Sequence, residues 1–254
     1  MIYAITNQKG GVGKTTTAAA LITGLHAQGY KVLGIDLDMQ GNLSYTMGTP
    51  KGRPTVLGVM LGEVPANEAI HHTPHGDIIP YAKGLNAAEK QFSDTGREYI
   101  LKKALEPIAG EYDFIIIDTP PALGILTVNA LTAAHALIIP AQADIYSTQA
   151  ILETHRTMQK VKEYCNHNLS YAGILLTRYN GRATITKEAE EHINGIAADM
   201  GTKVFTAHIR EGVSIKEAAA IREPLLQYAP KSNAAADYQE FITELLEGDN
   251  HNGK

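Results

Sequence analysis

The chain has 254 residues, of which 44% are hydrophobic and 19% charged, with a formal net charge of −5 and one cysteine. This composition excludes an intrinsically disordered chain, and the mild acidity argues against nucleic-acid binding by bulk charge alone. Because Cys165 cannot form an internal disulfide and no apolar run of 18 residues occurs, we expect a cytoplasmic protein without a membrane span.

Short apolar runs alternate with stretches of helical periodicity along the chain. The first strand, Ile2–Thr6, precedes a glycine-rich loop, a helix over Thr15–Gln28 and a strand over Val32–Asp36. Residues 39–92 are less regular, and we expect short helices and a strand near Asp77–Pro80 there. Further strands are predicted at Phe114–Ile117, Ala136–Ile139, Ile174–Leu176 and Val204–Phe205, and helices at Arg97–Ile108, Gln149–Tyr164, Thr186–Met200, Ser214–Ile221 and Ala235–Leu246.

This alternation predicts an α/β fold with a mostly parallel, doubly wound sheet flanked by helices on both faces. The run Phe114–Ile117 is apolar throughout, which is typical of a strand buried on both faces of such a sheet. No repeat, linker or break in composition divides the chain. We therefore predict one domain over residues 1–247, followed by a flexible tail at 248–254.

The segment between the first strand and the first helix reads Asn7-Gln8-Lys9-Gly10-Gly11-Val12-Gly13-Lys14-Thr15-Thr16. Glycines let successive backbone N–H groups point at one anion, and the start of the following helix adds partial positive charge. Lys14 can reach the β- and γ-phosphates of a nucleotide, and the Thr15 hydroxyl can bind Mg²⁺. Gln8 stands where the first glycine of a plain phosphate-binding loop is usual. The alternative, a chance glycine-rich turn, is disfavoured by the flanking strand and helix.

Three aspartates follow predicted strands. Asp118 ends the buried run Phe114–Ile117, a position that suits a residue holding Mg²⁺ through water. Asp36 and Asp38 end the second strand, two residues apart, and one of them could orient an attacking water. The alternative for each aspartate taken singly is a helix N-cap or a turn residue.

These residues resemble the deviant-Walker ATPases, most closely the ParA/Soj family of DNA-partitioning ATPases, over nearly the whole chain. The resemblance rests mainly on Lys9–Thr16, Asp36–Asn42 and Ile117–Pro121. It continues through Leu126–Leu131, Ile139–Gln142, Leu176–Arg182 and Glu217–Ala218. It implies a single-domain P-loop NTPase that uses ATP and Mg²⁺.

The resemblance also implies a mechanism. In that family ATP drives two subunits together face to face, and the signature lysine, here Lys9, reaches the partner's phosphates. The ATP-bound dimer binds DNA non-specifically on the nucleoid, and a ParB-like centromere-binding partner stimulates slow hydrolysis.

The resemblance further implies which residues form the sites. The implied catalytic residues are Lys9, Lys14 and Asp38, and the implied metal-binding residues are Thr15, Asp38 and Asp118. The implied nucleotide-binding residues are Lys9, Gly10, Gly11, Val12, Gly13, Lys14, Thr15, Thr16, Arg178 and Arg210, and the implied DNA-binding residues are Arg182 and Lys216.

The chain departs from the family pattern in three places. Met39 stands where the family usually has proline, and Arg210-Glu211-Gly212 replaces a usual Pro-Arg-Asn near the adenine pocket. A second family DNA-binding arginine aligns with Ser214, two residues before Lys216. Ordinary solvated surface charge is an alternative for both Arg182 and Lys216.

Other classes of protein share this loop. A membrane-surface ATPase of the MinD type needs a basic amphipathic C-terminal helix, whereas residues 232–254 carry one lysine and five acidic residues. An iron–sulfur ATPase needs two cysteines per subunit to bind a shared cluster, whereas this chain has only Cys165. A small-molecule synthetase with this fold is a further alternative, but we find no second group of residues in the sequence that would bind its substrate. The main alternative is a ParA-like ATPase that positions a protein cargo on the nucleoid.

One tract of histidines offers a different interpretation. The segment His71–His75 contains three histidines and could be read as metal-binding, but no second cluster of ligands accompanies it. Pro74 indicates a turn, so we predict a solvated loop.

Overall fold

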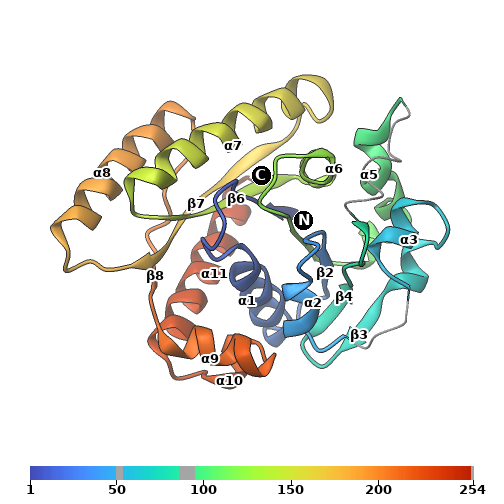
Figure 1. Ribbon diagram of the computed structural model, residues 1–254, viewed down its shortest axis with the longest axis horizontal. Helices are drawn as coiled ribbons and strands as arrows, with labels where there is room; N and C mark the ends of the chain where they lie inside the picture. Colours follow the sequence, from blue (N-terminus) through green and yellow to red (C-terminus); the bar gives the residue numbers. More distant parts are fainter. Residues whose placement is uncertain (50–53, 86–94, 253–254) are drawn as a thin grey trace.

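A computed structural model describes residues 1–49, 54–85 and 95–252 of the chain. Among these residues, eight strands form one sheet (Figure 1). From one edge to the other they run β3 (His71–Thr73), β4 (Gly76–Ile79), β2 (Val32–Asp36), β5 (Phe114–Asp118), β1 (Ile2–Ile5), β6 (Ala136–Gln142), β7 (Ser170–Tyr179) and β8 (Ile209–Arg210). Neighbouring strands pair in parallel, except that β3 is antiparallel to β4. The predicted α/β class with a mostly parallel sheet is confirmed.

Helices cover both faces of the sheet. The longer ones are α1 (Lys14–Ala27), α6 (Ile125–Ala133), α7 (Ile145–Tyr164), α8 (Thr184–Asp199), α9 (Val213–Ile221) and α11 (Asn233–Asn252). Shorter helices are α2 (Asn42–Thr46), α3 (Val56–Met60), α5 (Ile100–Leu105) and α10 (Leu225–Tyr228), with single turns at Ala66–Ala69, Arg97–Tyr99 and Ala109–Glu111. No helix in the described ranges is long and apolar enough to cross a membrane.

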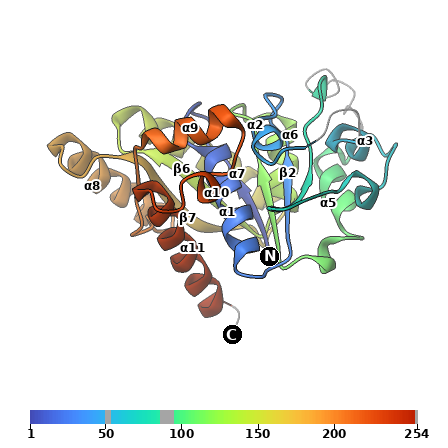
Figure 2. The same cartoon turned by 90° about the horizontal axis from the view of Figure 1, so that it is seen from below.

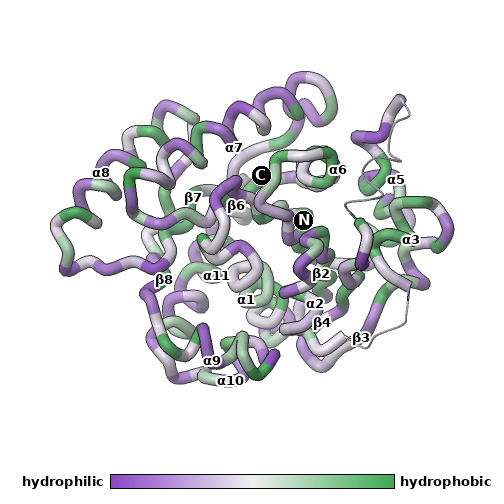
Figure 3. The backbone as a smooth tube through the Cα atoms, in the orientation of Figure 1, coloured by the Kyte–Doolittle hydropathy of each residue, from purple (hydrophilic) through white to green (hydrophobic). Residues whose placement is uncertain are grey.

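The alternation of side chains along the central strands creates two hydrophobic cores. On β1, Ile2 and Ala4 join the core under α3, α5, α6 and α7, whereas Tyr3 and Ile5 join the core under α1 and α11. Figure 2 shows α1, α9 and α11 together on one side of the sheet. In Figure 3 hydrophilic segments are prominent along the peripheral helices α7 and α8. Both faces of the sheet are thus buried, as parallel strands require.

The carboxyl ends of the parallel strands determine where a site can form. The loop that follows β1 leads into α1, and Asp36 at the end of β2 lies directly beside Asp118 at the end of β5. Because these ends meet at one edge of the sheet, the residues that follow them converge there.

Several sequence-based expectations need correction. Helix α6 was not predicted, because it is buried nearly all round and lacks an amphipathic period. The predicted strand Val204–Phe205 is only a single bridge from Val204 to Ile174, and the last strand lies at Ile209–Arg210 instead. The chain leaves the sheet after Phe205 because the backbone N–H groups of Thr206 and Ala207 donate to Glu244 of α11.

Two further boundaries differ. The segment expected as a solvated loop, His71–His75, begins with strand β3, and His71 is buried with its ring near the carbonyl of Pro54. No group of three or more His, Cys, Asp or Glu residues placed to hold a metal ion occurs in the described part of the chain, so these histidines form no such group. Helix α11 extends to Asn252, so it continues past residue 247, where we expected a flexible tail to begin.

Candidate functional site

The glycine loop between β1 and α1 forms an open cradle of backbone amides. Gly11 and Gly13 have φ angles of 72° and 90°, which glycine adopts without steric cost. Gly13 is the N-cap of α1 and supplies no side-chain cap, so the first amides of the helix face the loop. A cavity of about 410 Å³ lies over them and is lined by predicted site residues: Gly10, Gly11, Gly13, Lys14, Thr15, Thr16, Asp38 and Arg178. An anion in this cavity meets the positive end of α1.

Lys14 lies inside the loop. Its Nζ donates to the backbone carbonyl oxygens of Asn7 at 3.0 Å and Lys9 at 3.2 Å. Burial lowers the pKa of the Lys14 ammonium, while the charges of Asp118 and Asp38 act in the opposite direction. The ammonium is therefore a desolvated cation next to the cavity, where its attraction to an anion is strong.

Val12 differs from the rest of the loop because its side chain is buried and does not line the cavity. Its carbonyl oxygen accepts a hydrogen bond of 2.8 Å from the Thr177 hydroxyl on β7. Val12 thus anchors the loop to the sheet.

Asp118 is a buried carboxylate without a full set of partners. Neither of its side-chain oxygens accepts a hydrogen bond of standard geometry within the described structure. Burial raises the pKa of Asp118 well above its usual value, and the neighbouring Asp36 adds to that effect, whereas Thr15 and Lys14 oppose it. A divalent cation would relieve this repulsion, and oxygen ligands are the kind that Mg²⁺ prefers. The surroundings of Asp118 therefore fit a magnesium ion held with the help of Thr15.

Asp36 accepts hydrogen bonds from its own loop, a structural role that we did not predict from the sequence. One carboxylate oxygen accepts from the Asp38 backbone N–H at 3.1 Å, and the other accepts from the backbone N–H and the hydroxyl of Ser44 at 2.8 and 2.7 Å. Burial raises the pKa of Asp36 to about 7, although these hydrogen bonds lower it. Asp36 thus ties together both ends of the loop that carries Asp38.

The loop after β2 places Asp38 at the cavity. The Asp38 carboxylate accepts from the backbone N–H of Gln40 at 3.0 Å, and Gly41 turns the chain with φ of 64°. A side chain at position 41 would meet the ring of Tyr81, and the left-handed backbone there is strained for most other residues, so glycine is favoured. Asp38 is consequently held at the rim of the cavity by its own loop.

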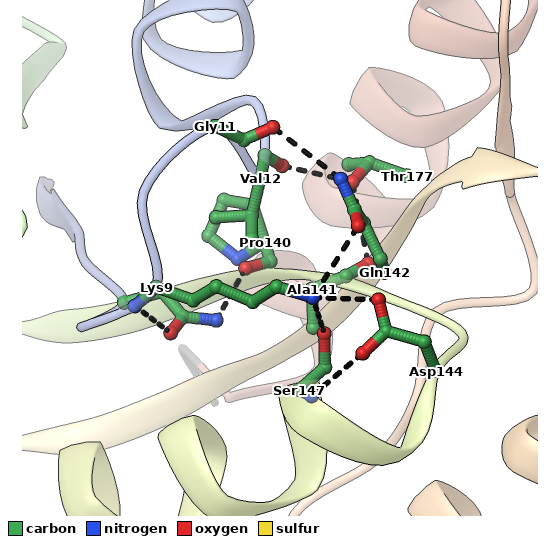
Figure 4. A network of polar contacts seen from close by, with 10 residues as sticks. Lys9, Gly11, Val12, Pro140, Ala141, Gln142, Asp144, Ser147 and Thr177 are labelled. Atoms are coloured by element: carbon green, nitrogen blue, oxygen red, sulfur yellow. Dashed lines mark hydrogen bonds and ion pairs between the residues drawn. The ribbon is translucent and has the colours of Figure 1, made fainter.

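The side chain of Lys9 points toward Asp144 and Ser147 at the start of α7, as Figure 4 shows. Its Nζ donates to Asp144 at 2.6 Å, Ser147 at 3.2 Å and Gln142 at 3.4 Å. The sequence motifs alone do not predict a role for Asp144 or Ser147. The spacing of Asp144 and Ser147, typical of a helix N-cap, was the available signal.

Of the two arginines predicted to bind nucleotide, one lines this cavity and the other does not. Arg178 lines it and has an unusual φ of 50°. Arg210 does not line it, because its guanidinium is paired with Asp237 of α11 and its Nε lies 3.0 Å from a carboxylate oxygen. Ile209, Ile215 and Tyr238 line the cavity near this point, and none of them was predicted.

The two predicted DNA-binding residues are on the surface. Arg182 is exposed between β7 and α8. Lys216 is exposed on α9, with its Nζ 3.4 Å from Glu211. Within one chain, therefore, Glu211 partly offsets the positive charge of Lys216.

Comparison with known proteins finds relatives over nearly the whole chain. The model of the AAA_31 family, an AAA domain, matches residues 1–171. Chromosome partitioning protein ParA of Caulobacter vibrioides is 37% identical over 252 residues, covering 96% of this chain and 93% of that protein. The sporulation initiation inhibitor protein Soj of Bacillus subtilis is 36% identical over 249 residues, covering 96% and 97%.

Solved structures are similar over the same length. Cobyrinic acid a,c-diamide synthase from Mycobacterium smegmatis, with bound ADP and magnesium, has a TM-score of 0.85 at 35% identity and covers 100% of this chain and 96% of its own. The ATP complex of a McdA variant from Cyanothece has a TM-score of 0.85 at 26% identity, with coverage of 97% and 96%. A fold similar to that of this chain therefore occurs in solved structures with bound nucleotide.

Proposed function

This chain belongs to the ParA/Soj family of chromosome-partitioning ATPases, and from that premise we propose that it is a slow ATP hydrolase that acts as a DNA-bound dimer. It forms a homodimer with ATP, binds DNA non-specifically in that state on the nucleoid, and drives plasmid or chromosome partitioning with a ParB-like partner. The observation that carries the proposal is the amide cradle with Lys14 inside it, together with the buried carboxylate of Asp118 near Thr15, which accepts no hydrogen bond of standard geometry from the described residues.

The residues around the cavity divide the work of binding and hydrolysis. The loop amides and Lys14 hold the phosphates, with Thr16 and Arg178 at the rim, and Thr15 and Asp118 hold Mg²⁺, which supplies charge neutralisation when bound. Asp38 orients the attacking water, because its carboxylate lies at the cavity on a loop closed by Asp36. Ile209, Ile215 and Tyr238 provide apolar surface for the base.

Lys9 is assigned to the phosphates of the second subunit. Two lysines approaching the same phosphates from one side would repel each other, whereas donation from a partner avoids this crowding. Dimer formation then depends on the γ-phosphate, so the nucleotide selects between monomer and dimer.

Removing the carboxylate of Asp38, which is proposed to orient the attacking water, should stop the ATPase cycle at the ATP-bound dimer. We expect Asp38→Ala to retain ATP binding and to accumulate a DNA-bound ATP dimer, with turnover reduced by about 10²-fold or more. Sedimentation with ATP measures the dimer and phosphate release measures turnover. A variant that sediments only as a monomer with ATP would contradict this role.

The proposed DNA-binding surface is made by two subunits, which is supported by the net charge of −5 of one chain and by the pairing of Lys216 with Glu211. The affinity for DNA should then fall steeply with salt, by about 0.9 log unit per log unit of salt for each phosphate neutralised. Arg182 and Lys216 are the proposed contacts.

Retention of DNA tests the proposal directly. The wild-type chain should retain DNA with ATP but not with ADP or without nucleotide, and retention should drop at the higher of two salt concentrations. Arg182→Ala and Lys216→Ala should weaken retention, while Lys187→Ala, which removes an exposed charge from α8, serves as the control. Equal retention in all three nucleotide states would overturn the nucleotide-switched binding.

An ATPase that positions a protein cargo on the nucleoid would use the same site, and the likeness to McdA supports keeping this second candidate. Both functions require the ATP-bound dimer and DNA binding. Identification of the protein that stimulates hydrolysis separates them, because a centromere-binding protein supports partitioning and a cargo-bound protein supports the alternative.

A further inference from the structure

The ammonium group of Lys9 is fully occupied inside its own chain. Three side-chain oxygens surround it, from Gln142 at the end of β6 and from Asp144 and Ser147 at the start of α7 (Figure 4). An ammonium group has three N–H donors, so this set, here called the Lys9 resting site, meets its hydrogen-bonding capacity. Lys9 therefore cannot reach another molecule's phosphates without leaving the resting site.

Asp144 is the anion of the resting site, and its two oxygens have separate tasks. One oxygen lies 2.6 Å from Lys9 Nζ, and the other caps α7 by accepting from the Ser147 backbone N–H at 2.8 Å. Burial alone would raise the pKa of Asp144, but the hydrogen bonds from Lys9 and Ser147 outweigh it and lower the pKa. Asp144 is thus ionised at neutral pH and attracts Lys9 as a phosphate oxygen would.

The ion pair between Lys9 and Asp144 is partly exposed to solvent, so another anion can displace the carboxylate. The side chains of Lys9 and Asp144 are 25% and 34% exposed, so solvent screens part of their attraction. Directly after Asp144, Ile145 and Tyr146 are each 78% exposed, which leaves an apolar pair beside the resting site. Apolar side chains exposed in this way are covered favourably when a second chain approaches.

We propose that Asp144 regulates dimer formation by holding Lys9 within its own chain until the phosphates of a second copy replace the carboxylate. The inference rests on the proposed function, because it assumes that Lys9 acts across the dimer. Asp144 is a positioning residue in this account, and the partner is a second copy of the chain. Because Lys9 must leave the Asp144 carboxylate before it can bind the partner's phosphates, the ion pair raises the ATP concentration that dimer formation requires.

The first experiment measures the ion pair alone, in nucleotide-free protein. Asp144→Asn keeps an oxygen that can cap α7 but removes the charge that attracts Lys9. Labelling of Lys9 by an amine-reactive reagent, followed by mass spectrometry, should become about three- to tenfold faster in this variant. Labelling of Lys187 should not change. Glu163→Gln removes the same charge from the other end of α7 and should leave Lys9 labelling unchanged.

The second experiment measures the consequence. Sedimentation across a series of ATP concentrations should show that Asp144→Asn forms the dimer at an ATP concentration about three- to tenfold lower than wild type, while Glu163→Gln behaves as wild type. Unchanged Lys9 labelling overturns the ion pair, and faster labelling with an unchanged ATP requirement overturns its regulatory role. A wild-type chain that stays monomeric at every ATP concentration overturns the proposed function itself, and the labelling result still reports separately on the ion pair.

Discussion

Replacing Lys9 by alanine is expected to abolish ATP hydrolysis and the ATP-dependent dimer while leaving nucleotide binding intact. Lys14, with its ammonium inside the loop, and the amides of Gly10–Gly13 still hold the phosphates of their own chain. A cationic group supplied across an interface stabilises the transition-state charge, and its loss costs about 10³-fold or more in turnover. Steady-state phosphate release, sedimentation with ATP and equilibrium binding of ATP measure the three quantities separately.

The control for this prediction is Lys187→Ala, which removes an exposed lysine from α8 and should leave all three quantities unchanged. Full ATPase activity in Lys9→Ala would show that Lys9 is not used in hydrolysis. Loss of ATP binding along with hydrolysis would instead place Lys9 at the phosphates of its own chain, against its observed contact with Asp144.

Replacing Asp118 by asparagine is expected to change both the pH dependence of stability and the response to magnesium. The pKa of Asp118 is raised in the folded chain, first by burial and then by Asp36. Between the ordinary pKa and the raised pKa, the folded chain binds a proton more tightly than the unfolded chain. Stability conferred by the protonated form is therefore lost as the pH rises through the raised value.

Asp118→Asn removes this loss because the amide does not ionise. The free energy of unfolding of the variant, relative to wild type, should therefore increase from pH 5 to pH 8 by at least about 1 kcal/mol, the worth of a shift of somewhat less than one pKa unit. Urea denaturation at the two pH values, without nucleotide or metal, measures it. Asp199→Asn, at an exposed position on α8, should show no such change.

The same variant should respond little to ligand. A ligand present at 100 times its Kd stabilises the folded state by about 2.7 kcal/mol, and wild type should gain stability of this order with ATP and Mg²⁺. Asp118→Asn should gain clearly less, because a metal-binding oxygen is missing. A pH-independent difference from wild type, together with an undiminished gain from Mg²⁺, would show that Asp118 neither carries the raised pKa nor holds the metal.

Much of the fold could be predicted because it depends on local patterns. The segment Lys9–Thr16 follows a strand and leads into a helix as expected, and strand Val32–Asp36 has the predicted bounds. Helix α6 was not predicted because a helix buried nearly all round has no polar face to reveal its period. The strand expected at Val204–Phe205 was wrong because Glu244, which is 38 residues away from Thr206 in the chain, binds the backbone there.

The roles of the charged residues divide in the same way. The sequence by itself determined which residues can bind phosphate and metal, since glycine, lysine, threonine and aspartate have those properties wherever they lie. Only the tertiary structure decided their present partners: Lys9 with Asp144, Arg210 with Asp237, and Asp36 with Ser44. A charged side chain binds the nearest suitable group in space, and that group is set by how distant segments pack rather than by spacing along the chain.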